Sequence, residues 1–254
     1  MTDMLLQVTW LLAIDALFLG ILALMLLPMA IYKRAAFAVL RRNFISYFSN
    51  PTGYVFLCLF VLLTSFAAFW PHEFFIANLA NLDQLNRFLP FIMLIFVPAI
   101  TMGVWAEEKR QGTDELLLTI PADDFDIVIG KYLAAVGVFT ASLLFSQISN
   151  YVVLVSLTNA SMDTGLFFAN YFGYWMIGLS MIAIGMTGSF ISSNLTVSFI
   201  LGALFNAPLA FSTFADVILP PPFADWLSQW SISSQFEPFG RGVMNLGSIV
   251  FFLM

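Results

Sequence analysis

The sequence predicts an all-α protein, a polytopic helical bundle in a membrane. Of its 254 residues, 61% are hydrophobic and only 9% are charged, and the mean hydropathy is +0.93. Soluble domains carry about 25% charged residues, so an ordinary soluble fold is excluded. A helix needs about 20 largely apolar residues to cross the hydrocarbon core, so a chain of this length holds about six crossings in one membrane domain.

Long apolar runs locate the expected membrane spans. We predict spans at residues 5–30, 54–70, 90–106, 128–157, 166–190 and 196–218, with a last span that starts near residue 243. The first run is too long for a signal-peptide core and lacks a basic leader, so it is expected to be a real span. The last run reaches only residue 254, and twelve helical residues rise only about 18 Å. We therefore expect a truncated last span.

The basic residues predict the orientation. Successive connections between the predicted spans lie on opposite sides of the membrane. Counted in this way, seven Lys and Arg residues lie on one side and two on the other. The first group is Lys33, Arg34, Arg41, Arg42, Lys109, Arg110 and Lys131, and the second is Arg87 and Arg241. Because cytoplasmic loops carry the excess of Lys and Arg, segments 31–53 and 107–131 are predicted to be cytoplasmic. Segments 71–89, 158–165 and 219–242 are then external.

Residues 31–50 form a different kind of segment. The basic residues Arg34, Arg41 and Arg42 interrupt it, yet Phe37, Leu40, Phe44 and Phe48 recur at helical spacing. The pattern predicts an amphipathic helix in the cytoplasmic membrane interface, with basic groups toward anionic headgroups.

The connection over residues 105–131 holds a large share of the chain's charged residues. Gly112 is expected to end the helix that leaves the preceding span, and Thr113 to begin a short helix that Pro121 stops. Asp123 is a predicted N-cap for the next long helix. Because Leu116, Leu117 and Leu118 cannot all face one side of a helix, one leucine is available to a partner protein. The alternative is an ordinary helical hairpin packed back on the bundle.

This connection resembles a loop of a known family. Its acidic pair, basic residue, Gly-Thr, Glu followed by leucines, and Thr-x-Pro resemble the loop between the second and third spans of ABC type 2 export permeases, most closely the gliding-motility (GldF-like) group. The residues that carry the resemblance are Glu107, Glu108, Lys109, Gly112, Thr113, Glu115, Leu116, Leu117, Leu118, Thr119 and Pro121. Residues 41–51 and 240–243 resemble two further regions of that family.

The resemblance covers residues 29–254 and implies a transmembrane domain of six spans in the bacterial cytoplasmic (inner) membrane. It implies that the loop is a coupling helix, contacting a separate ATP-binding subunit, and that a second permease subunit completes a homo- or heterodimer. Segment 219–242 corresponds to the external region before the last span. Residues 1–28 are an extra N-terminal apolar segment, expected to be an additional span unless translation starts at Met29.

The residues that catalysis would need are absent from the sequence. A phosphate-binding loop would need GxxxxGK[ST], but Gly130-Lys131 is followed by Tyr132 and has Phe125 in place of the first glycine. One histidine and one cysteine supply neither a metal site nor a catalytic triad. We therefore expect no enzyme activity, no cofactor in this chain, ATP in the partner subunit, and no nucleic-acid partner.

Two stripes of small or polar residues lie within the predicted spans. Ser142, Ser146 and Asn150 share one helical face, and Gly185, Ser189 and Ser193 form a small-xxx-small series. Both are expected to pack helices together; the first face is also a candidate for a substrate path or a dimer interface. Asp15 is the one acidic residue inside an apolar run.

The predicted function is an ABC-exporter permease subunit. The alternative is a membrane anchor or assembly subunit that docks partners without transport. A secondary carrier would be expected to show paired charges in its spans.

Overall fold

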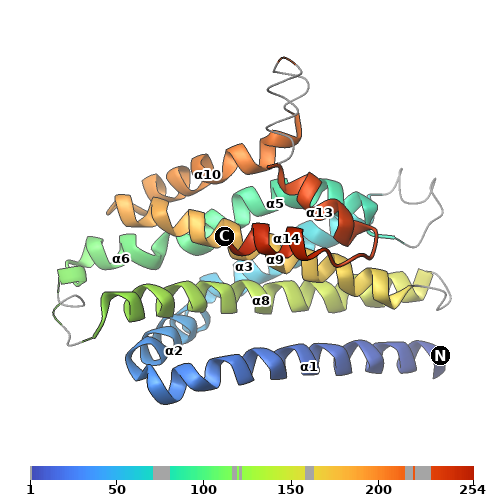
Figure 1. Cartoon of the computed structure of the whole chain (residues 1–254), viewed down its shortest axis with the longest axis horizontal. Coiled ribbons are helices and arrows are strands. Elements are labelled where there is room, and N and C mark those ends of the chain that lie inside the picture. The colour runs from blue at the N-terminus through green and yellow to red at the C-terminus, as the bar shows by residue number, and fades with distance from the viewer. Residues whose placement is uncertain are drawn as a thin grey trace. The chain divides into compact units, whose positions relative to one another are not determined.

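The computed structural model describes residues 2–70, 81–115, 119, 122–157, 163–214, 220 and 230–254. Throughout these ranges the regular secondary structure is helical, which confirms the predicted all-α class. The helices divide between two compact units, Met1–Asn81 with Leu117–Thr164, and Leu82–Leu116 with Gly165–Met254. Figure 1 labels the helices along the chain.

The first unit contains α1 (Thr2–Tyr32), α2 (Arg34–Ser49), α3 (Pro51–Ala68) and α8 (Asp124–Leu157). Helices α2 and α3 meet at a bend of 77°. The bend follows from Asn50-Pro51: proline occupies the first turn of α3, and the residue before a proline is driven out of the helical region. Asn50 accordingly has the extended φ and ψ values −106° and 144°.

Glycines allow α8 to approach α2 closely. A Cβ atom on Gly130 would lie 2.6 Å from the carbonyl oxygen of Ala36, and one on Gly137 would lie 3.0 Å from the ring of Phe44. Lys131, next to Gly130, is only 1% exposed. The Lys131 side chain is therefore covered by packing along this part of α8.

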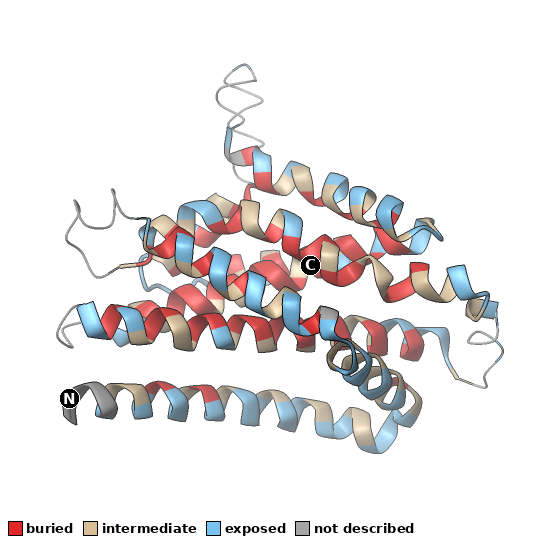
Figure 2. Ribbon diagram, turned by 180° about the vertical axis from the view of Figure 1, so that it is seen from behind, coloured by how far each residue is buried: buried red, intermediate tan, exposed pale blue. Residues whose placement is uncertain are grey.

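Helix α1 is mostly exposed along its length, as the pale blue and tan turns in Figure 2 show. Its buried positions include Leu11 and Asp15, which lie one turn apart. The side chain of Gln147 in α8 donates a hydrogen bond of 2.8 Å to Oδ1 of Asp15. A buried polar pair therefore attaches α1, whose exposed surface is otherwise apolar, to α8.

The second unit contains α5 (Asp83–Thr101), α6 (Gly103–Gln111), α9 (Thr164–Ile191), α10 (Leu195–Phe211), a short 3-10 turn (Ser212–Phe214), α13 (Ile232–Gly240) and α14 (Leu246–Leu253). The turn between α9 and α10 ends at Asn194, whose side chain accepts from the N–H groups of Thr196 and Val197 and caps α10. Gly188 and Gly202 bring these two helices into backbone contact.

Four described helices are long and apolar enough to cross a membrane: Leu6–Tyr32, Asp83–Gln111, Asp124–Leu157 and Thr164–Ile191. A fifth is added if the bent pair α2–α3 forms one span, and α10 is a shorter apolar helix. A multi-pass membrane protein is supported, whereas the predicted count of six family spans plus one is not confirmed. The span predicted over 90–106 instead begins as a helix at Asp83 and continues, with a break, to Gln111.

Candidate functional site

The candidate site is the charged end of the α5–α6 helix and the connection after it, for which the family resemblance implies a coupling helix. Helix α5 ends at Thr101 and α6 begins at Gly103, so the helix breaks at Met102. Pro98 lies one turn before the break, inside α5. The Pro98 carbonyl accepts the N–H of Met102 at 2.8 Å, so a helical hydrogen bond crosses the interruption.

A serine from α9 is hydrogen-bonded to Met102 and to the first turn of α6. The Ser189 hydroxyl accepts hydrogen bonds from the backbone N–H groups of Trp105, at 3.0 Å, and Ala106, at 3.1 Å. It donates one to the carbonyl oxygen of Met102, at 2.8 Å. One donor and two lone pairs are thereby all used, and Ser189 is fully buried. The hydroxyl therefore attaches Met102 and the first turn of α6 to α9.

Phe190, the next residue, makes a second set of contacts with α6. Its carbonyl oxygen accepts a hydrogen bond from Nζ of Lys109, and the same ammonium lies 4.4 Å from the centroid of the Phe190 ring. The indole of Trp105 packs edge-on against that ring, with centroids 5.5 Å apart. Helix α6 is thus anchored to the end of α9 by cation–π, aromatic and hydrogen-bond contacts.

Gly112 ends α6, as the sequence predicts. Its φ of 66° lies in the left-handed region that favours glycine. The N–H of Gly112 donates to the carbonyl of Lys109, and the N–H of Thr113 donates to the carbonyl of Glu108. This is the Schellman arrangement, which satisfies carbonyls at a helix end. Asp114 and Glu115 return to helix, whereas Leu116, Leu117, Leu118 and Pro121 lie outside the described residues.

The residues of α6 become more exposed from its start toward Gly112. Val104, Trp105 and Ala106 are buried, whereas Arg110 and Gln111 are exposed. Glu107 accepts from both of the latter, at 2.6 Å and 2.7 Å. Glu115 and Thr119 are exposed beyond Gly112. The start of α6 is therefore buried and attached to α9, whereas its end is exposed and charged.

The far side of the connection belongs to the first unit. Asp123 accepts the N–H of Phe125 at 3.4 Å, as expected of the predicted N-cap. Asp126, in the first turn of α8, forms an ion pair of 2.9 Å with Lys33. The hydrogen bond to the Asp126 carboxylate, together with its charge, raises the pKa of Lys33 above its usual value.

The polar face of α8 packs against α3. Ser146 and Thr64 share a hydrogen bond of 2.7 Å, and the Ser65 hydroxyl donates to Oδ1 of Asn150 at 2.7 Å. Ser142 donates to the carbonyl of Val138 in its own helix. The bonds of Ser146 and Asn150 therefore join α8 to α3, whereas that of Ser142 does not.

The second small-residue stripe also packs helices. A Cβ atom on Gly185 would lie 2.6 Å from Oγ1 of Thr101, and Ser189 bonds to α6. Ser193, the third member, is exposed. Sequence spacing therefore identified Gly185 and Ser189 as contact residues, but it carried no sign that Ser189 hydrogen-bonds at a helix break or that Phe190 binds Lys109.

The predicted interface helix is α2. Arg34, Arg41 and Arg42 are exposed, whereas Phe37 and Phe44 are half-buried. The amphipathic division follows the sequence pattern, and the location of α2 at the membrane surface stays a prediction.

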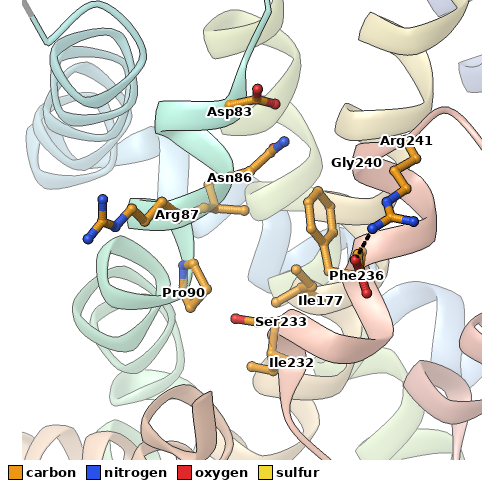
Figure 3. Close-up of a pocket in the computed structure, with 12 residues that line it drawn as sticks. Asp83, Asn86, Arg87, Pro90, Ile177, Ile232, Ser233, Phe236, Gly240 and Arg241 are labelled. Atoms are coloured by element: carbon orange, nitrogen blue, oxygen red, sulfur yellow. Dashed lines mark hydrogen bonds and ion pairs between the residues drawn. The ribbon is translucent and has the colours of Figure 1, made fainter. Parts of the chain in front are cut away.

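A cavity of about 380 Å³ lies within the second unit, among α5, α9 and α13. Figure 3 shows Asn86 and Phe236 directed toward its interior, and Arg241 paired with Glu237 at its edge. The Tyr174 hydroxyl donates to Oδ1 of Asn86 and fixes that side chain. The full lining is Asp83, Asn86, Arg87, Leu89, Pro90, Ile177, Ile232, Ser233, Phe236, Glu237, Gly240 and Arg241. An apolar wall with a charged rim suits a small amphiphilic group. Sequence reasoning missed this cavity, because its lining comes from three separate helices.

Comparison with known proteins bears on both units. No curated protein and no solved structure matches the chain. A family model described as ABC-2 family transporter protein matches residues 78–248, more than half of the chain. The match includes the α5–α6 helix, the charged connection, α8, α9 and α10. Together with the apolar helices long enough to span a membrane, it shows that the chain belongs to the ABC-2 transporter family.

Proposed function

We propose that this chain is the transmembrane permease subunit of an ATP-binding-cassette exporter and moves a substrate across the bacterial cytoplasmic membrane. The observation that carries the proposal is the family match over residues 78–248. Membership of that family implies a partner ATP-binding subunit and a multi-pass location in a lipid membrane. ATP is then bound and hydrolysed in the partner, and this chain has no enzymatic step and no cofactor of its own.

The charged connection is the proposed docking segment. It is defined by Glu107, Glu108, Lys109, Gly112, Thr113 and Glu115, with Leu116, Leu117, Leu118, Thr119 and Pro121. Two observations support this assignment. The start of α6 is buried and bonded to α9, whereas its end is exposed. The segment also joins one compact unit to the other along the chain. Displacement of this segment by a partner would therefore act on helices of both units, as a rigid-body transition requires.

The finer features of the proposal follow from the sequence resemblance. We propose that the chain resembles the gliding-motility-like group, that a dimer of permease subunits is the transporting assembly, and that α2 is a helix of the cytoplasmic interface. From the charge bias we infer that the docking segment is cytoplasmic and that the end of α5 near the cavity is external.

The experiment pairs the full-length chain, in lipid vesicles, with the ATP-binding subunit encoded by an adjacent reading frame. We expect the two subunits to co-purify and the permease to stimulate ATP hydrolysis. Glu115→Ala and Gly112→Ala should reduce stimulation without reducing membrane insertion. Asp163→Ala is the matched control, because it removes an exposed carboxylate that is distant in sequence from the docking segment and does not line the cavity.

The second candidate is an anchor or assembly subunit that docks partners without transport. It needs the same docking surface but no conformational cycle. Stable binding of the ATP-binding subunit with no change in its ATPase rate would favour the anchor. Loss of stimulation in Asp163→Ala equal to that in Glu115→Ala would contradict the assignment of the docking segment.

A further inference from the structure

Two side-chain amides lie beside Gly240, at the cavity of the second unit. A Cβ atom on Gly240 would lie 3.5 Å from Nδ2 of Asn86, on α5, and 4.0 Å from Oδ1 of Asn170, on α9. Gly240 itself ends α13 and lines the cavity. Because glycine carries no side chain, the space that a methyl group would fill is open to another group beside the two amides.

Each amide has one hydrogen-bonding group that the described residues do not use. The carbonyl oxygen of Asn86 accepts the Tyr174 hydroxyl, whereas its Nδ2 donates to none of the described residues. The opposite holds for Asn170, which is only 2% exposed. Its Nδ2 donates to the carbonyl of Leu166 at 2.8 Å, but its buried Oδ1 has no partner among the described residues. Since buried polar atoms are nearly always hydrogen-bonded, this acceptor indicates a bound group that donates to it.

The rest of the cavity combines apolar walls with an uncharged polar group. In Figure 3 the Asn86 side chain extends from α5 toward α13, and the Ser233 hydroxyl points from α13 toward α5. The apolar surface comes from Leu89, Pro90, Ile177, Ile232 and Phe236. A ligand that fits this lining has an apolar body and a head that forms hydrogen bonds.

The charged residues of the lining do not favour a charged ligand. Glu237 and Arg241 form an ion pair, and the other two, Asp83 and Arg87, carry opposite charges. All four are exposed, and in Figure 3 Arg87 points away from α13. The groups nearest the unpaired acceptor are therefore neutral, and an uncharged head avoids the desolvation cost of a buried charge.

We propose that this cavity binds an uncharged amphiphile whose hydroxyl group occupies the space beside Gly240. A hydroxyl both donates and accepts, so it serves Oδ1 of Asn170 and Nδ2 of Asn86 together. Its alkyl part lies against the apolar walls. The volume of about 380 Å³ falls among small-ligand sites, which span about 300–1,000 Å³. The ligand class is an alkyl alcohol, either free or as part of a monoacylglycerol. The site belongs to the second unit alone and does not depend on the proposed function.

The first test is photolabelling of the full-length chain in lipid nanodiscs. The probe is octanol with a diazirine in its alkyl chain, and labelled peptides are identified by mass spectrometry. We expect labelling that excess octanol removes in the peptides containing residues 83–90 and 232–241. Octanol should compete about tenfold more effectively than octyl methyl ether, which accepts a hydrogen bond but donates none.

The ether controls for the membrane. Because it is more apolar than octanol, it enters lipid more readily, so non-specific displacement would give the opposite order of competition. Equal competition by the two compounds, or competition confined to other peptides, would overturn the proposal.

Three further competitors define the ligand class. Octanoate and octylamine carry a charged head on the same chain and should compete more weakly than octanol. Stronger competition by either would overturn the uncharged class. Competition by 1-octanoylglycerol equal to that by octanol would support the site with a membrane lipid as its source, whereas weaker competition would support it with a free alcohol.

Gly240→Ala is the variant that fills the proposed hydroxyl position. Its methyl group would meet its nearest neighbours at 3.5–4.0 Å, which is ordinary contact, so the unfolding temperature should be unchanged. The competable labelling should decrease about tenfold, since the added methyl group takes the space of the ligand. The matched control is Gly247→Ala, whose methyl group would meet Asn245 at the same range of distances but outside the cavity lining. Wild-type labelling in Gly240→Ala would overturn the proposal.

Asn170→Leu tests the hydrogen bond itself. It keeps the side-chain volume but removes an unpaired buried oxygen, so the unfolding temperature without ligand should not decrease. The preference for octanol over the ether should disappear, because no acceptor is left for the hydroxyl. A retained preference would overturn the assigned hydrogen bond. An unfolding temperature below that of the wild type would overturn it as well, because Oδ1 of Asn170 would then be satisfied in the unliganded protein.

Discussion

Gln147 and Asp15 join α8 to α1 through a buried hydrogen bond of 2.8 Å. Asp15 lies before the region that matches the ABC-2 family, whereas Gln147 lies inside it. The second carboxyl oxygen of Asp15 is buried and has no hydrogen-bond partner among the described residues. Since polar contacts hold helices together in an apolar environment, this pair attaches the additional helix to the family domain.

Removing only one partner of this pair should be costly. In Gln147→Leu the carboxyl group of Asp15 stays buried without its donor, and we expect a loss of about 1–3 kcal/mol in stability. The double variant Asp15→Leu with Gln147→Leu should recover most of that loss, because no polar group is left stranded. Thermal unfolding in nanodiscs measures the stability of the wild type, of each single variant and of the double variant. A double variant less stable than Gln147→Leu alone would contradict the prediction.

The end of α6 depends on the left-handed conformation of Gly112. Because an L-residue is strained at a φ of 66°, Gly112→Ala should loosen the turn by about 1 kcal/mol, whereas Gly112→Asn should be better tolerated. Amide exchange over residues 107–115 measures the effect. Gly103→Ala is the control, since no atom would meet its Cβ and alanine favours helix. Equal exchange in Gly112→Ala and Gly103→Ala would count against the assigned turn.

Local chemistry made several features predictable from the sequence. Gly112 and Asp123 act at the helix ends where their residue types indicated, because caps depend on neighbours only a few residues away. The amphipathic division of α2 and the packing of Gly185 were also predictable, since helical spacing sets which residues share a face. The all-α class followed from composition.

The tertiary contacts were not predictable in this way. The break at Met102 lies within an apolar run whose pattern continues through it, and Ser189, whose hydroxyl bonds to Met102, is 87 positions away. The start of α5 was placed too late, because Asp83 and Arg87 precede the apolar run yet belong to the helix. The burial of Lys131 likewise depends on packing that a hydropathy pattern does not report.

Two glycines in contact should respond differently to the same substitution. A Cβ atom on Gly188 would lie 2.6 Å from the backbone nitrogen of Gly202, whereas one on Gly202 would meet its nearest atom, in Pro98, at 3.4 Å. Gly188→Ala must therefore displace backbone, and we expect it to cost about 1–3 kcal/mol. Gly202→Ala requires only ordinary van der Waals contact and should be close to neutral. Thermal unfolding of both variants beside Gly20→Ala, which meets no atom within 4 Å, tests this difference.

The ion pair between Lys33 and Asp126 predicts a pH dependence. Its hydrogen bond and charge raise the pKa of Lys33 above the ordinary value of 10.5. A raised lysine pKa means that the folded state favours the charged form, so the contribution is complete below about pH 10 and is lost as the pH rises through the folded-state pKa. The stability difference between the wild type and Lys33→Met should be constant from about pH 7 to about pH 9 and decrease toward about pH 11. Because the Lys33 side chain is 52% exposed, the difference should also decrease with added salt.

The control for this titration is the exposed pair of Arg241 and Glu237. Because a guanidinium keeps its charge throughout this pH range, the difference between the wild type and Arg241→Met should not follow the same alkaline decrease. A parallel decrease in both variants would mean that the alkaline effect is a general property of the protein and not of Lys33. A Lys33→Met difference that grows above about pH 10 would have the opposite sign to linkage through a raised pKa, and would require Lys33 to be favoured in its neutral form in the folded protein.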